Sequence, residues 1–462
     1  MKPLLLKGAQ VITMAAGRPD VERTDVLVEG DRIAAIGEAL PSDGAEVVDL
    51  RGRIVIPGLI NAHLHTWQTA LRGVGADWTL LDYLSNMHGG VAGRYAPDDM
   101  RISTLAGALN QINCGVTTVG DWCHNTPSPD HATQAVQGLA DARIRAVFMH
   151  GTPYSAADAP HPLGEIDALM NGPISRHPLL TLGMAIKGPQ LSTPAVALAD
   201  FHAANERGLV VSMHQSGGQP TPAWTAVRDA GLIGPRTNIV HGADLSDEWL
   251  ETFVDAGASF TITPENELGQ GHGIPITGRL LKLGSAPSLG TDVDAIVSSE
   301  VLIAARIAAA HQRGMDHLMQ RQLTGTGTEK ATITSKQILS WVTVEGARAL
   351  GLSEDVGCLL PGMQADLVVV DATALNLWPA HDAVAAALHA SIANIEAVMI
   401  AGEWRKRDHE LLDVDLDDVA DRLLASAERL MQQLNKRGVL AGLKRRVVRR
   451  VVGRRLAQQG RQ

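Results

Sequence analysis

The chain of 462 residues has few of the features that mark secreted, membrane-bound or nucleic-acid-binding proteins. Its three cysteines, Cys114, Cys123 and Cys358, are an odd number at spacings that match no disulfide framework or zinc motif, which favours a reducing compartment. No uncharged apolar run reaches the ~18–20 residues of a membrane span. The run Leu4–Leu6 is too short for the apolar part of a secretion signal. We therefore predict a cytoplasmic protein.

A basic excess is also missing, because 50 acidic and 40 basic residues give a formal net charge of −10. Nucleic-acid-binding proteins usually carry a basic face, so this balance argues against such a partner. Hydrophobic residues make up 45% of the chain and charged residues 19%, which is typical of globular proteins and argues against extensive disorder.

The two ends of the chain share a pattern of short β-rich runs separated by turns. Such runs fill residues 1–58 and return in residues 350–410, for example at Ala365–Val370 and Ile395–Ile400. We predict that the two ends pair into one small β-sandwich domain. Residues 411–462 follow as a helical, basic extension, with a helix at Val414–Gln433 and a solvated or oligomer-facing basic tail at Gly442–Arg455.

Residues 59–349 show a different pattern, in which apolar strand-like runs alternate with longer amphipathic segments such as Thr193–Arg207 and Asp247–Ala256. This alternation is typical of βαβ units with a parallel sheet. Eight strands are expected, at Val55–Asn61, Gly115–Gly120, Arg145–His150, Leu180–Ala185, Gly208–His214, Asn238–His241, Ser259–Thr263 and Ser288–Thr291. We therefore predict an α/β chain whose main domain is a (β/α)8 TIM barrel.

Residues of the types that bind metal ions stand where these strands end. His63 and His65 follow the first strand at period-two spacing, which places both imidazoles on one side of an extended chain. His214 and His241 end two later strands, and Asp292 ends the last. Each residue alone is weak evidence, but all of them fall at the barrel face that carries active sites. A divalent ion held there would lower the pKa of a bound water to roughly 7 and so supply a nucleophile at neutral pH.

Longer stretches resemble the amidohydrolase superfamily. The opening motif of the superfamily resembles Pro57-Gly58-Leu59-Ile60-Asn61-Ala62-His63-Leu64-His65 with Leu71-Arg72-Gly73. Its second barrel strand resembles Gly115-Val116-Thr117-Thr118-Val119. Three later segments also resemble motifs of this superfamily. They are His241 with Leu245-Ser246-Asp247-Glu248, then Asn266, then Leu289-Gly290-Thr291-Asp292. The resemblance runs from about residue 4 to about residue 405. It is greatest to the branch of cytosine, guanine and S-adenosylhomocysteine deaminases and triazine hydrolases.

The resemblance implies a barrel with a β-sandwich built from both termini. It also implies one divalent metal ion on His63, His65, His214 and Asp292, with zinc favoured and iron, manganese or cobalt as alternatives. In such a site Asp292 takes a proton from the attacking water and passes it to the leaving group. His241 orients that water and stabilises charge on the attacked group.

The chain departs from this family at two places. The deaminases of the branch usually carry a glutamate three residues after the histidine that corresponds to His214, and Gly217 stands there instead. Gln215, Glu265 and Glu267 are possible substitutes at other positions. Lys187 stands where the family often has a histidine, so it is expected to contact the substrate or to be structural. A second metal ion bridged by a carbamylated Lys187 is the disfavoured alternative.

The remaining expectations concern the substrate. The predicted substrate-binding residues are Trp67, Gln68, Lys187, Asn266 and His272, with Trp122 and His124 as further candidates. Asp82, Asp121 and Asp294 are interpreted as helix caps or solvated residues. We expect a hydrolase that cleaves a non-peptide C–N bond of an amide, carbamate or urea. A deaminase of an amino-substituted heterocycle and an inactive scaffold are the alternatives. We also expect a small-molecule substrate and a homo-oligomer (dimer or tetramer). We expect no nucleic-acid partner and no membrane association.

Overall fold

The computed structural model describes residues 2–435, so the predicted basic tail at Gly442–Arg455 lies outside the described residues. These residues divide into two compact units. The first contains residues up to 62, 109–119 and 299–414, and the second contains residues 63–108, 120–298 and 415–435. The domain boundaries predicted at residues 58, 350 and 410 stay predictions. No helix in the described part of the chain is both long enough and apolar enough to cross a membrane.

The first unit contains a mixed sheet of nine strands built from both ends of the chain. The N-terminal strands are β1 (Leu4–Val11), β2 (Glu22–Glu29), β3 (Arg32–Gly37), β4 (Glu46–Asp49) and β5 (Arg53–Pro57). The C-terminal strands are β14 (Leu367–Asp371), β15 (Ile395–Ile400), β16 (Glu403–Arg407) and β17 (Glu410–Leu411). The helices of this unit are α10 (Val301–Thr324), α11 (Ser335–Trp341), α12 (Val344–Ala349) and α13 (Ala383–His389), with the short η5 (Ile392–Asn394).

The two ends of the chain meet where β5 pairs antiparallel with β14, with Ile56 opposite Val368. Buried side chains from both ends, such as Leu6, Val28 and Met399, then pack into one core. Neither end could bury its apolar face alone, because each supplies only part of the sheet. The predicted β-domain assembled from both termini is therefore confirmed.

The second sheet has eight strands in the order β6 to β13. They are β6 (Leu59–Leu64), β7 (Val116–Cys123), β8 (Arg145–His150), β9 (Leu180–Ala185), β10 (Val210–Gln215), β11 (Thr237–His241), β12 (Ser259–Ile262) and β13 (Ser288–Leu289). A parallel bridge between Leu64 and Asp292 joins the last strand to the first. Strand order therefore follows sequence order and the sheet closes on itself, which is the predicted (β/α)8 barrel.

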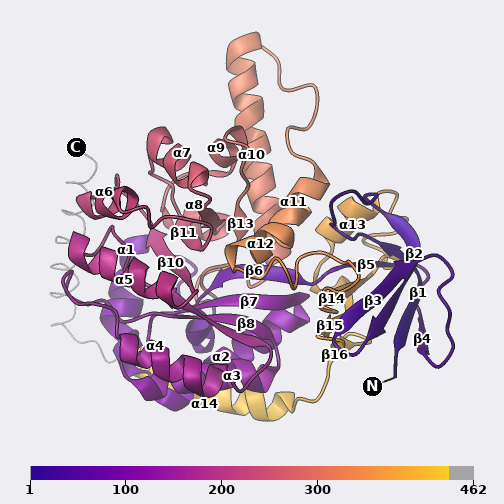
Figure 1. Ribbon diagram of the computed structural model, residues 1–462, viewed down its shortest axis with the longest axis horizontal. Helices are drawn as coiled ribbons and strands as arrows, with labels where there is room; N and C mark the ends of the chain where they lie inside the picture. The colour runs from indigo at the N-terminus through magenta and orange to yellow at the C-terminus, as the bar shows by residue number, and fades with distance from the viewer. Residues whose placement is uncertain (1, 436–462) are drawn as a thin grey trace. The chain divides into compact units, whose positions relative to one another are not determined.

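The remaining helices belong to the second unit, apart from the end of α2 (Figure 1). They are η1 (Thr66–Leu71), α1 (Leu80–Tyr83), η2 (Leu84–Val91), η3 (Ala92–Arg94), α3 (Pro129–Ala142), α4 (Leu163–Leu169), η4 (Met170–Ile174), α5 (Pro194–Glu206), α6 (Pro222–Asp229), α7 (Asp247–Asp255), α8 (Pro264–Gln270), α9 (Thr277–Lys282) and α14 (Leu416–Asn435), with the first part of α2 (Pro97–Asn113). Thr193 and Ser246 cap α5 and α7 by accepting hydrogen bonds from backbone amides, so these two helices begin as their sequences predict.

The predicted strand Val55–Asn61 is two strands instead of one. Arg53–Pro57 pairs with β1 and β14 in the terminal sheet, whereas Leu59–Leu64 begins the barrel. Gly58 alone separates them, and β5 ends at Pro57, which lacks the amide hydrogen that would continue the ladder. A Cβ on Gly58 would lie 2.0 Å from Thr117 Oγ1, so only glycine fits this crossing.

Candidate active site

Four predicted metal ligands come together at the carboxyl ends of the barrel strands. Asp292 Oδ1 lies 3.3 Å from His63 Nε2 and 3.2 Å from His65 Nε2. His214 Nε2 lies 3.3 Å from His63 Nε2. Nitrogen ligands about 2.0–2.1 Å from a tetrahedral zinc are separated from one another by roughly 3.3 Å. The group, hereafter the ligand cluster, therefore has the donor types and spacing of a divalent metal site.

Backbone contacts between the first and last strands set this spacing. The amide of His65 donates to Asp292 O at 2.8 Å, and the amide of Asp292 donates to His63 O at 3.0 Å. Gly290 makes the close approach possible, since a Cβ there would lie 2.4 Å from His63 O. The closure of the barrel therefore places one carboxylate beside two imidazoles that are distant from it in sequence.

Hydrogen bonds also fix how these imidazoles present their nitrogens. His65 Nδ1 donates to the carbonyl of Trp122, which leaves Nε2 with its lone pair toward Asp292. Trp122 is held in turn by a buried chain of hydrogen bonds that joins strands β7, β10, β11, β12 and β13. The residues of this chain are Trp122, Ser212, Asn238, Thr261 and Ser288.

The charge states of the cluster suit metal binding. Burial lowers the pKa of His63 to about 4 and that of His214 well below its ordinary value, so both imidazoles are neutral at pH 7. Burial raises the pKa of Asp292, but the neighbouring His63 and His65 side chains outweigh it and hold that pKa well below its usual range. Neutral imidazoles and an ionised carboxylate are the forms that bind a divalent cation.

His241 and Asp292, the predicted catalytic pair, share an uncommon backbone conformation. Their φ angles are 71° and 65°, in the left-handed region that side chains other than glycine rarely adopt. Such strain gathers at sites where the surrounding structure requires one orientation of a side chain. The His241 ring stacks on His214 at 5.5 Å between centroids and 27° between planes.

Two predicted substrate-binding residues adjoin this pair. Asn266 Nδ2 donates to Asp292 Oδ2, and Thr263 Oγ1 approaches the same oxygen at 3.4 Å. The His272 ring centroid lies 4.5 Å from that of His241, and the side chain is buried. Asn266 therefore fixes the second oxygen of Asp292, while His272 has a ring nitrogen within 4.8 Å of ligand atoms of both His241 and Asp292.

A group of aromatic and imidazole rings adjoins the ligand cluster on the side of η1 and η2. We call it the ring cluster, and its members are Trp67, Tyr83, His88, His124 and Tyr154. The rings follow one another by contact, from His65 to His124 at 4.3 Å and from His124 to His88 at 4.6 Å. Gln68 Nε2 donates to the hydroxyl of Tyr83 at 2.6 Å, so this predicted residue orders a ring.

Sequence reasoning missed Tyr83, His88 and Tyr154. His88 lies in the π-helix η2, and Tyr154 follows β8 in an irregular loop. None of the three stands at a strand end or at a family position quoted above. The only available signal was that all of them occupy segments after barrel strands, where substrate contacts collect.

Lys187 is not brought together with these residues. It follows β9, and its Nζ donates to the carbonyls of Ala156 and Ala159 at 2.5 and 2.7 Å. No described hydrogen bond joins this ammonium to the ligand cluster. Its predicted contact with a substrate stays a prediction.

The interpretation of Asp121 and Asp294 as caps or solvated residues is wrong, since they are 0% and 3% exposed. Asp121 accepts hydrogen bonds from the amide and hydroxyl of Thr66, and burial raises its pKa to about 6. Asp294 accepts from Thr69 Oγ1 at 2.9 Å. Both carboxylates therefore anchor η1, the segment that carries Trp67 and Gln68.

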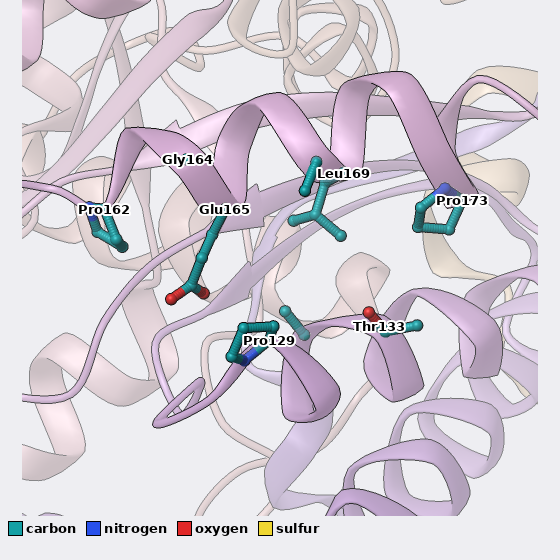
Figure 2. Close-up of a pocket in the computed structure, with 9 residues that line it drawn as sticks. Pro129, Thr133, Pro162, Gly164, Glu165, Leu169 and Pro173 are labelled. Carbon is teal, nitrogen blue, oxygen red and sulfur yellow. The ribbon is translucent and has the colours of Figure 1, made fainter.

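A separate cavity of about 390 Å³ lies between α3 and α4 (Figure 2). Its lining is mostly apolar, and the carboxylate of Glu165 points into it. Glu165 Oε2 lies 3.3 Å from Nε2 of the buried His150. None of the predicted site residues lines this cavity.

Known proteins resemble this chain over almost its whole length. A 5-methylthioadenosine/S-adenosylhomocysteine deaminase of Symbiobacterium thermophilum is 27% identical over 452 residues, covering 94% of this chain and all of that one. An adenosine deaminase from Xanthomonas campestris, solved with bound zinc, superposes with a TM-score of 0.79 at 22% identity over 93% of this chain and 98% of that one. Atrazine chlorohydrolase from Arthrobacter aurescens TC1, complexed with zinc, has a TM-score of 0.79 at 21% identity over 92% of this chain and all of that one.

The amidohydrolase family itself matches residues 54–405, which include every member of the ligand cluster. That match spans both the barrel and the strands β14 and β15 of the terminal sheet. This chain therefore belongs to the amidohydrolase family and is a hydrolase of carbon–nitrogen bonds other than peptide bonds.

Proposed function

We propose that this hydrolase removes an amino group from a neutral nitrogen heterocycle, with a divalent ion held by His63, His65, His214 and Asp292. The observation that carries the proposal is the ring cluster beside the ligand cluster. Flat heterocycles stack well on aromatic and imidazole rings. The names of the relatives, which include deaminases of adenine nucleosides, support the same leaving group.

The charge of the ring cluster supports a neutral substrate. Burial lowers the pKa of His88 to about 3 and that of His124 well below its ordinary value, and it raises the pKa of Tyr83. These rings are therefore uncharged at pH 7. Among the residues that the structure describes, no lysine or arginine contacts these rings through a described hydrogen bond or ring contact. A carboxylate-bearing substrate would leave its charge unpaired here, at a considerable cost in binding free energy.

The donor set fits zinc, and iron, manganese or cobalt remain alternatives. When bound, such an ion supplies a Lewis acid that lowers the pKa of water and polarises the attacked carbon's substituents. Asp292 then accepts a proton at Oδ2, the oxygen that Asn266 steadies, and returns it to the leaving amine as ammonia departs. His241 holds the attacking water in line with the carbon.

A second candidate is the hydrolysis of an amide, carbamate or urea, which the sequence favoured. It is supported by Gly217 in place of the glutamate that serves ring deamination in similar proteins. Gln215 does not replace it, since its Oε1 accepts from Trp224 Nε1 and its Nε2 donates to the carbonyls of Gly217 and Gly218. The intact ligand cluster argues against the inactive scaffold.

Ammonia release measured on a panel of compounds separates these candidates. The purified chain is reconstituted in turn with zinc, iron(II), manganese and cobalt. It is then given 5′-methylthioadenosine, S-adenosylhomocysteine, adenosine and melamine beside simple amides, carbamates and ureas. We expect ammonia from the uncharged amino-heterocycles, with the amino group replaced in the product, and slower release from S-adenosylhomocysteine, whose carboxylate would be left unpaired. Turnover of amides or ureas alone would overturn the proposal in favour of the second candidate.

We also propose a reducing, cytoplasmic location and a homo-oligomer. The location is supported by Cys114, Cys123 and Cys358, all of which are free thiols. Light scattering of the purified protein measures the oligomer, and a mass of one chain would contradict it.

A further inference from the structure

Behind His241 lies a buried carboxylate that the proposed function does not use. Glu267, in α8, is 0% exposed, and its Oε1 lies 3.1 Å from His241 Nδ1. The amide of Thr263 donates to the same oxygen at 2.9 Å. Removing a carboxylate from water is costly unless hydrogen bonds satisfy it, so its position against a strained histidine of the site indicates a specific task.

The hydrogen bond determines which nitrogen of His241 carries the hydrogen. Glu267 Oε1 already accepts from the Thr263 amide, so it is an acceptor toward His241 Nδ1 as well, and Thr263 Oγ1, 3.3 Å from Nδ1, can accept the same hydrogen. Nδ1 therefore donates, and Nε2 keeps its lone pair. A ring nitrogen of His241 lies within 4.8 Å of a ligand atom of Asp292 and of His272. With Nδ1 engaged by Glu267, Nε2 is the ring nitrogen that stays available as a hydrogen-bond acceptor.

We propose that Glu267 is a positioning residue that fixes His241 in the Nδ1–H tautomer, so that Nε2 accepts a hydrogen bond from the attacking water. The inference rests on the proposed function for the identity of the reaction. Glu267 is not a member of the ligand cluster, and it acts through His241. The chain thus carries a carboxylate behind the β11 histidine, while it lacks one three residues after His214 of β10.

Glu265 provides a matched control, because it is the same residue type two positions away in α8 and is less buried. Glu267→Leu removes the acceptor, and Glu267→Gln keeps an oxygen that can accept from both Nδ1 and the Thr263 amide. A merely structural Glu267 would also stabilise the start of α8, so the test needs a readout that helix stability does not change.

The first readout is the tautomer itself, which needs no substrate. Nitrogen-15 NMR of the zinc-loaded, histidine-labelled protein identifies the His241 signals by their absence in His241→Ala. We expect Nδ1 protonated and Nε2 unprotonated in the wild type and in Glu267→Gln, and a changed tautomer in Glu267→Leu. An unchanged tautomer in Glu267→Leu would overturn the inference, and it would leave the proposed function standing.

The second readout is a double-mutant cycle, measured with the panel compound that releases ammonia fastest, beginning with 5′-methylthioadenosine. Loss of the partner of a site histidine is expected to lower kcat about 10- to 100-fold in Glu267→Leu, with KM, zinc content and Tm close to those of Glu265→Leu. Glu267→Gln should stay within about threefold of wild type, since the hydrogen bond is kept.

Adding Glu267→Leu to His241→Ala should lower kcat by less than about a further twofold, compared with His241→Ala alone. A residue that acts through His241 has nothing left to position once that histidine is gone. A full additional loss in that background would contradict the inference. So would a Glu267→Leu variant with wild-type kcat.

Discussion

The ligand cluster and the ring cluster adjoin one another, yet they are built in different ways. His63, His65, His214 and Asp292 stand at the ends of barrel strands, where backbone pairing fixes their spacing. The ring cluster is carried by the 3-10 helix η1, the π-helix η2 and the segments after β7 and β8. We therefore expect the strand ends to determine which reaction the site performs, and the segments that follow the strands to determine which substrates bind.

The largest effect that this comparison predicts is the loss of metal and activity together in His63→Ala. His63 contacts both Asp292 and His214 in the ligand cluster, so its removal opens the coordination set. Metal content by mass spectrometry and ammonia release should both fall to background, while circular dichroism stays near that of the wild type. Full activity of this variant after chelation would show that the ligand cluster is misplaced.

Asp292→Asn comes next, because it keeps the shape of the side chain and removes its basicity. Loss of a general base is expected to lower kcat by about 100- to 10,000-fold. The effect on Tm should be milder, since the backbone bridge between Asp292 and Leu64 remains. Rates like those of the wild type would refute the role of Asp292 as base.

Substitution in the ring cluster should have a smaller effect and a different character. His88→Leu removes a ring that contacts His124, Tyr83 and Tyr154. A lost ring contact of about 0.5–1.5 kcal/mol corresponds to roughly a 2- to 12-fold rise in KM. Zinc content should not change, and the ranking of heterocycles in the panel should. A loss of zinc in His88→Leu would show that the two clusters are not separable.

Lys187→Met is expected to have the smallest effect on catalysis and to show whether Lys187 contacts the substrate. Because its ammonium donates to Ala156 O and Ala159 O, the variant should lose stability, by about 1–3 kcal/mol for hydrogen bonds to a charged group. Denaturant unfolding measures this loss. A rise in KM without a loss of stability would instead support the substrate contact that the sequence predicted.

The ligand cluster was predictable because its residues occupy positions that the strand pattern defines. An apolar run followed by His63 and His65, or by Asp292, indicates a strand end in any parallel barrel. Glu267 was only one of three candidate carboxylate or amide substitutes, since nothing in the sequence says that α8 turns its side chain toward His241. His88 and Tyr154 gave no periodic signal, because His88 lies in a π-helix, whose repeat differs from that of an α-helix, and Tyr154 lies in an irregular segment.

The sequence by itself determined the α/β class, the pairing of the two chain ends, and the identity of the groups that can bind a divalent ion, because periodicity and strand-end position are local properties. Only the tertiary structure decided where β5 ends and β6 begins, that Asp121 and Asp294 are buried anchors, and that Glu267 stands behind His241. These features depend on contacts between segments far apart in the chain, and such contacts exist only once the barrel has closed through Leu64 and Asp292.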